Sequence, residues 1–300
     1  MDTLISILEF LDTKMEVPSL YGWYHITWLI ITVLAAVILC RFCKTGDDRG
    51  PRRVVAITTA IVILLEIYKQ INYTFTVSEG TIVTDYQWYA FPFQFCSTPM
   101  YVGLLASVLK KGKVRDALYA YLATYGMFGG LCVMIYPGDV YVSTAGINFQ
   151  SMVCHSTMVA VGIYLFYSGA VKVSHKTILK AMAVFACAVG IACALNEHLY
   201  AVGLEETFNM FYISPHYEGT LPVYSLVQKV VPYPWCLVIY IAVFSLAAYV
   251  ILLCAMLCKK LFSNPSAKNF RVWRIHPPTL RFPHIFELRK PLLKAASIEE

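Results

Sequence analysis

Residues 233–260 read YPWCLVIYIAVFSLAAYVILLCAMLCKK, an apolar run without a charged side chain until the two lysines that end it. A helix rises about 1.5 Å per residue, so about 20 apolar residues cross a hydrocarbon core of about 30 Å. Six similar runs precede this one along the chain. The seven predicted membrane-spanning helices are 23–43, 53–75, 93–110, 114–136, 148–169, 176–200 and 233–260.

The composition agrees with a membrane protein. The chain has 300 residues, of which 58% are hydrophobic and only 14% are charged. A soluble domain carries about 25% charged residues, so this chain has too little polar surface for a water-soluble globule. The net charge of +6 does not indicate nucleic-acid binding, because the basic side chains cluster at helix ends. We therefore predict an all-α, polytopic protein whose partners are membrane lipids.

The distribution of Lys and Arg predicts the topology. All but Lys14, Lys69 and Lys229 of the 24 basic residues fall in the segments 41–53, 110–115, 172–180 and 259–294. These segments are alternate connections, and the positive-inside rule places them in the cytoplasm. The prediction is therefore seven helices with the N-terminus outside and the C-terminus inside. It divides the chain into an extracytoplasmic segment 1–22, a transmembrane domain 23–262 and a basic cytoplasmic tail 263–300.

Two further segments carry weaker signals. Leu4, Ile7, Leu8 and Leu11 recur at helical spacing and predict a short amphipathic helix near the N-terminus. The connection 201–232 is long and rather apolar, so we expect it to dip into the membrane or to cover a site.

The ten cysteines lie mostly in apolar runs and are expected to pack as small apolar side chains, with no metal or cofactor.

Polar side chains inside a membrane are costly, so each of them is a candidate for function. Helix directions place most of them in the outer half of the bundle. The candidates for catalysis are His155, Cys96, Gln94 and Asn209, and those for substrate binding are Glu66, Lys69, Asn196 and His198. A transport path would need polar groups at both levels of the membrane, and the inner half has few beyond its basic rim. The pattern favours a site open to the outer leaflet over a channel.

Each candidate also has a structural interpretation. His155 is either a general base or a histidine whose ring is satisfied by a neighbouring carbonyl. Cys96 is either a thiol activated at a helix N-terminus or an inert packing residue. Glu66 and Lys69 form a site charge pair or an ion pair that fixes the bundle. Asn196 and His198 would otherwise end a solvated helix, and Asn209 would form a turn.

Three short segments resemble a known family. WYAFPFQFC at 88–96 resembles the segment around the third helix of the bacterial YwaF-type integral membrane proteins. VCH at 153–155 and the following MVAVGIYL at 158–165 resemble that family's fifth helix, and NMFYISP at 209–215 resembles its Asn-led segment after helix 6. The layout over residues 20–260 is also similar to animal transmembrane protein 164, a membrane acyltransferase that acts on phospholipids.

The resemblance implies a seven-helix bundle and acyl transfer through a Cys and a His. His155 matches the histidine of the fifth helix, and Cys96 matches the bacterial cysteine. Gln94 stands where many members have His, and Phe93 stands where the animal member has its proposed nucleophile. The closer bacterial match in this segment implies a bacterial plasma membrane. Two hypotheses follow: a phospholipid acyltransferase, or a protein that binds or transports lipids or small molecules without chemistry.

Overall fold

The computed structural model describes residues 2–43, 47–204, 207–219, 221 and 224–263. These residues belong to one unit, Met1–Asn264. The predicted cytoplasmic tail, 263–300, lies outside the described residues apart from Ser263, as does Lys44 of the first basic segment.

Long helices dominate the described part of the chain, which confirms the all-α membrane class. Six of them are long and apolar enough to span a membrane. They are α2 (Trp23–Phe42), α3 (Arg49–Asn72), the continuous helix Lys113–Ile135, α7 (Ala145–Tyr167), α8 (Lys176–Ala201) and α10 (Trp235–Ser263). Each corresponds to one of the predicted runs, with ends that differ by a few residues.

The predicted helix 93–110 is shorter in the structure. Helix α4 covers only Thr98–Val108, 11 residues, which correspond to about 16 Å of rise. Pro99 lies in its first turn, where proline favours helix initiation, and Pro92 keeps the preceding residue extended. The residues between the two prolines therefore form turns before the helix begins. Seven crossings and the direction of insertion stay predictions.

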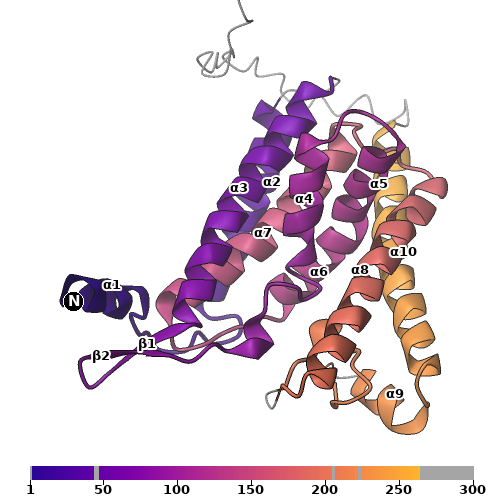
Figure 1. Cartoon of the computed structure of the whole chain (residues 1–300). Coiled ribbons are helices and arrows are strands. Elements are labelled where there is room, and N and C mark those ends of the chain that lie inside the picture. The colour runs from indigo at the N-terminus through magenta and orange to yellow at the C-terminus, as the bar shows by residue number, and fades with distance from the viewer. Residues whose placement is uncertain (1, 44–46, 205–206, 220, 222–223, 264–300) are drawn as a thin grey trace, which may run out of the picture. The chain divides into compact units, whose positions relative to one another are not determined.

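Helix α7 lies at the centre of the helices (Figure 1), and it packs against α2, α3 and the helix Lys113–Ile135. Glycine permits the closest of these contacts. A Cβ on Gly130 would lie 2.8 Å from the carbonyl oxygen of His155. The hydroxyls of Thr32 and Ser156 hydrogen bond at 2.8 Å and join α2 to α7. His155 therefore lies deep in the protein rather than at its lipid-facing surface.

The helix Lys113–Ile135 consists of α5 (Lys113–Tyr121), a π-helical turn η2 (Leu122–Gly126) and α6 (Met127–Ile135). A π-helical turn inserts an extra residue and is frequent at functional sites. Here Leu122 and Gly126, the two ends of the turn, line a cavity beside α7. The sequence prediction of a regular helix did not include this turn.

The structure also contains a hairpin that the sequence prediction missed. Strands β1 (Phe75–Ser78) and β2 (Thr81–Thr84) pair antiparallel. Between them, Glu79 and Gly80 both have positive φ, 51° and 71°, as a tight hairpin turn requires. No strand was predicted in the connection between the helices 53–75 and 93–110, although its alternating β-branched residues favour strands.

The short N-terminal helix is confirmed as α1 (Asp2–Leu11), which contacts β1. Tyr68 of α3 donates a hydrogen bond to the carbonyl of Leu11 at 2.8 Å. Leu8 is buried, whereas Leu4 and Ile7 of the predicted apolar face stay about half exposed. The helix is therefore fastened at its C-terminal end, and part of its apolar face is left uncovered.

Candidate functional site

The segment 208–214 is irregular in conformation and yet buried. Phe208, Met210, Phe211 and Ile213 are each no more than 1% exposed, and the short helix η3 (Met210–Tyr212) packs against α8. Backbone groups in a nonpolar interior need partners, because water is not there to supply them. This segment was expected to dip inward or to cover a site, and its burial agrees with that expectation.

Side-chain amides supply those partners. Asn196 donates to the carbonyl of Met210 at 3.1 Å and accepts from its N–H at 2.7 Å. Gln94 donates to the carbonyl of Asn209 at 3.1 Å and accepts from the N–H of Phe211 at 2.9 Å. Asn209 in turn accepts from the N–H of Ser214 at 2.9 Å. We call Gln94, Asn196 and Asn209 the amide clamp.

The clamp holds a backbone that would otherwise be unfavourable. Phe211 and Tyr212 have φ of 60° and 59°, the left-handed region that costs non-glycine residues about 1–2 kcal/mol each. Such conformations persist where surrounding contacts fix them. Three candidates from the sequence are therefore brought together, with both polar atoms of Gln94 and of Asn196 bonded to backbone.

His155 is bonded through only one ring nitrogen. Its Nδ1 lies 2.7 Å from the carbonyl oxygen of Ser151, one turn earlier in α7. A carbonyl only accepts, so Nδ1 carries the proton and Nε2 keeps its lone pair. Nε2 is buried and has no hydrogen-bond partner among the described residues. The ring is thus held in the tautomer and orientation that a general base requires.

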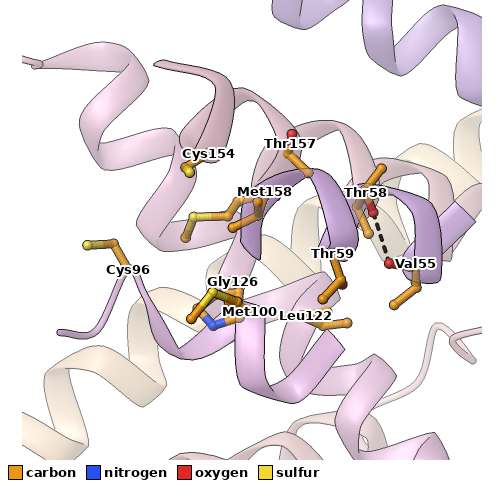
Figure 2. Close-up of a pocket in the computed structure, with 13 residues that line it drawn as sticks. Val55, Thr58, Thr59, Cys96, Met100, Leu122, Gly126, Cys154, Thr157 and Met158 are labelled. Atoms are coloured by element: carbon orange, nitrogen blue, oxygen red, sulfur yellow. Dashed lines mark hydrogen bonds between the residues drawn. The ribbon is translucent and has the colours of Figure 1, made fainter. Parts of the chain in front are cut away.

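Cys96 lies in the turn just before α4 and lines a narrow cavity of about 40 Å³. Figure 2 shows Cys96 and Cys154 at one end of the cavity and Val55 and Thr58 at the other. The walls come from α3, α4, η2 and α7. His155 is not one of the lining residues, although it follows the lining residue Cys154 directly.

The charged candidates form a network on α3. Lys69 Nζ lies 2.8 Å from Glu66 Oε1, and both side chains are at most 15% exposed. Gln70 donates to the same carboxylate oxygen at 2.8 Å and accepts from the Tyr86 hydroxyl at 2.8 Å. The charge of Lys69 acts on both Cys96 and His155. Glu66 and Lys69 thus form a buried charge pair on α3, and their grouping with Cys96 and His155 in one site stays a prediction.

Two members of this network were not predicted from the sequence. Gln70 was overlooked although it follows Glu66 by four residues, the spacing at which helical side chains meet. Tyr86 lies in the second predicted connection, between the helices 53–75 and 93–110, and its position in the sequence does not indicate a bond to Gln70. Burial and the nearby Glu66 raise the pKa of Tyr86, so its hydroxyl stays a donor near neutral pH.

His198 lies apart from both groups. It is exposed near the end of α8, whereas its neighbour Glu197 accepts a hydrogen bond from His216 at 3.0 Å. His216 also stacks on Tyr200, with 3.5 Å between ring centroids. Within the described part of the chain, no group of three or more His, Cys, Asp or Glu side chains is placed to hold a metal ion.

The comparisons with known proteins give one match. The family model described as the TMEM164 family matches residues 20–254, which include all eight candidate site residues. No curated protein and no solved structure matches the chain.

Proposed function

This chain belongs to the TMEM164 family, and we propose that it is a phospholipid acyltransferase with its site in the outer half of the bundle. The observation that carries the proposal is that Nε2 of His155 is buried without a hydrogen-bond partner. His155 directly follows Cys154, which lines the same cavity as Cys96. A buried nitrogen lone pair without a hydrogen-bond partner costs free energy, so its presence in the folded protein favours a catalytic role for this nitrogen.

The proposed reaction has two halves. The Cys96 thiol gives its proton to His155 Nε2, and the sulfur attacks the ester carbonyl of a phospholipid. The C–O bond breaks, the lysophospholipid oxygen takes the proton from His155, and the acyl group remains as a thioester. A second lysophospholipid hydroxyl then loses its proton to His155 and attacks the thioester, which returns Cys96 to the thiol. No electrons are gained or lost overall.

Gln94 and Asn209 were the candidates for stabilising the oxyanion. Both polar atoms of Gln94 bond to the segment 209–211, and Asn209 accepts from Ser214. Gln94 therefore stabilises an oxyanion only by releasing one of these bonds. In the resting protein, its role is to hold the turn that carries Cys96 two residues later.

A lipid-binding protein without chemistry is the second candidate. It is favoured by the absence of His155 from the cavity lining and by the buried pair of Glu66 and Lys69. In that case Glu66 and Lys69 would contact a lipid headgroup, whereas Asn196 is bonded to Met210 and His198 lies apart. Both candidates take membrane lipid as the ligand.

The orientation and the membrane are also proposals. The alternation of basic segments supports an outer N-terminus and a cytoplasmic C-terminus. The likeness of residues 88–96 to the bacterial YwaF-type segment supports a bacterial plasma membrane.

The test is acyl exchange by the purified, full-length protein in detergent-lipid micelles. The assay follows transfer of an acyl chain from phosphatidylcholine to labelled lysophosphatidylethanolamine. We expect activity in the parent, loss in His155→Ala and Cys96→Ser, and no change in Cys132→Ser, whose thiol is exposed on α6. A parent that is folded and binds lysophospholipid but transfers nothing would favour the lipid-binding candidate.

A further inference from the structure

A second hollow lies beside the cavity of Cys96, on the surface of α3 and α4. It is a groove of about 490 Å³, within the range of about 300–1,000 Å³ typical of small-molecule sites. Ile67 and Leu104, one from each helix, line it and are 52% and 46% exposed. Because α3 is a candidate span, membrane hydrocarbon is the medium that meets these side chains.

The lining of the groove is mostly apolar, and its polar side chains are Glu66 and Gln70 of α3, Thr74 just after α3, and Tyr101 of α4. Glu66 and Gln70 provide the polar end, where Glu66 bonds to both Lys69 and Gln70. Ile63, about one turn before Glu66 on α3, and Leu104 of α4 continue the wall without polar groups. This division fits an amphiphile with a hydrocarbon chain and a polar ester or hydroxyl end, and it does not fit a polar solute.

Met100 separates the groove from the cavity. Its side chain lines both hollows, and it is the one residue that they share within the described structure. Methionine is unbranched and flexible, so it changes shape at low cost. One turn further along α4 the helices are closed, since a Cβ on Gly103 would lie 2.2 Å from the Thr59 hydroxyl. The thinnest division between the hollows is therefore at Met100.

We propose that the groove between α3 and α4 binds one acyl chain of a membrane phospholipid, and that movement of Met100 opens it to Cys96. The first half stands without the chemistry, whereas the second rests on the acyl transfer proposed above. The substrate then enters sideways from the lipid, with its ester near Glu66 and Gln70. The aqueous face is not its route.

Photo-crosslinking tests the groove without any need for activity. The full-length protein is reconstituted in phosphatidylcholine vesicles that contain phosphatidylethanolamine with a diazirine on one acyl chain, and labelled peptides are mapped by mass spectrometry. We expect labelling concentrated on residues 63–71 and 100–104. Leu104→Trp fills the groove and should lower this labelling at least about fivefold. Leu64→Trp, on α3 and 67% exposed outside the groove, should leave it unchanged.

Alkylation of Cys96 by a lipid-soluble maleimide tests the division at Met100. Met100→Ala should accelerate the reaction about tenfold and Met100→Leu should leave it near the parent rate, because leucine nearly conserves the volume. Labelling of α3 and α4 no stronger than that of the exposed face of α10 would overturn the groove. An alkylation rate unaffected by Met100→Ala would overturn the gate. Groove labelling in a protein without acyl exchange would instead retain the groove and reject the proposed enzyme.

Discussion

Gln94 and Cys96 are two residues apart in the sequence, but they belong to two different groups of polar side chains. Gln94 is part of the amide clamp, and Cys96 is paired with His155 in the proposed catalytic group. The two groups differ in how fully their polar atoms are hydrogen bonded. In the amide clamp, both polar atoms of Gln94 and of Asn196 reach backbone partners. In the second group, His155 bonds through Nδ1 alone and leaves Nε2 without a partner. Buried polar groups in folded proteins are nearly always satisfied, so the difference separates side chains that hold the structure from one available for chemistry.

Four other buried polar atoms of the described residues lack partners: Arg115 Nε and the hydroxyls of Tyr119, Tyr224 and Tyr240. None of these atoms is a base near neutral pH, whereas an imidazole nitrogen is. The combination of burial, a missing partner and basic character is what distinguishes His155.

A second buried histidine gives the sharpest test. His25 is fully buried and bonds through both nitrogens, accepting from the Tyr21 N–H at 3.0 Å and donating to the Met134 carbonyl at 2.8 Å. We expect His155→Ala to reduce acyl exchange by about 10²–10⁴-fold with little loss of stability. His25→Ala should lower the unfolding temperature and keep the activity of each folded molecule. Equal effects of the two variants on activity would remove the distinction on which the proposed site rests.

Removing a side chain of the amide clamp should lower the stability of the folded protein. Asn196→Leu leaves the N–H and carbonyl of Met210 buried without partners, a cost of about 1–3 kcal/mol for each group. We expect a lower unfolding temperature in detergent and faster hydrogen exchange at residues 208–214. His198→Leu, nearby on α8 and exposed, is the matched control and should change neither. Protection of 208–214 that survives Asn196→Leu would show that packing alone holds the segment.

The sequence predicted the helices because each carries its own signal of length and apolar composition. Cys96 and His155 were reached by the cost of polar groups in a membrane together with the family resemblance. The hydrogen bonds between Asn196 and Met210 could not be predicted from the sequence, because the two residues meet only through a turn of irregular backbone. The same limit applies to Gln94: its spacing from Cys96 is visible in the sequence, but its bonds to residues 209 and 211 depend on the tertiary fold.

The start of α4 shows a different limit. The apolar run from residue 93 predicted a continuous helix, since hydropathy does not distinguish turns from helix in a buried segment. Pro92 and Pro99 were visible, but their effect depended on whether other residues could satisfy the unwound backbone. Ser97 and Thr98 donate their N–H groups to the Gln94 carbonyl, at 2.8 and 3.2 Å, and so make the turns possible.

The charge pair should affect the thiol moderately. Burial disfavours the Cys96 thiolate, and Lys69→Met removes a positive charge that partly opposes this effect. We expect alkylation of Cys96 by a neutral, membrane-soluble maleimide to slow by about tenfold or less, one pKa unit being about 1.4 kcal/mol. Lys229→Met, 59% exposed, should leave the rate unchanged. In the parent, Cys96 should react faster than Cys154, and equal slow labelling would favour the lipid-binding protein.

The smallest effect is expected at Tyr86. Tyr86→Phe removes one hydrogen bond to Gln70 Oε1, while Gln70 keeps its bonds to Glu66 and to the Ala90 carbonyl. A single bond of this kind contributes about 0.5–1.5 kcal/mol, so the unfolding temperature should fall only slightly. Because Glu66 stays paired with Lys69, acyl exchange should stay within about twofold of the parent. A large loss of activity in this variant would mean that Tyr86 contacts the substrate, and the polar end of the groove would then extend to the connection between α3 and α4.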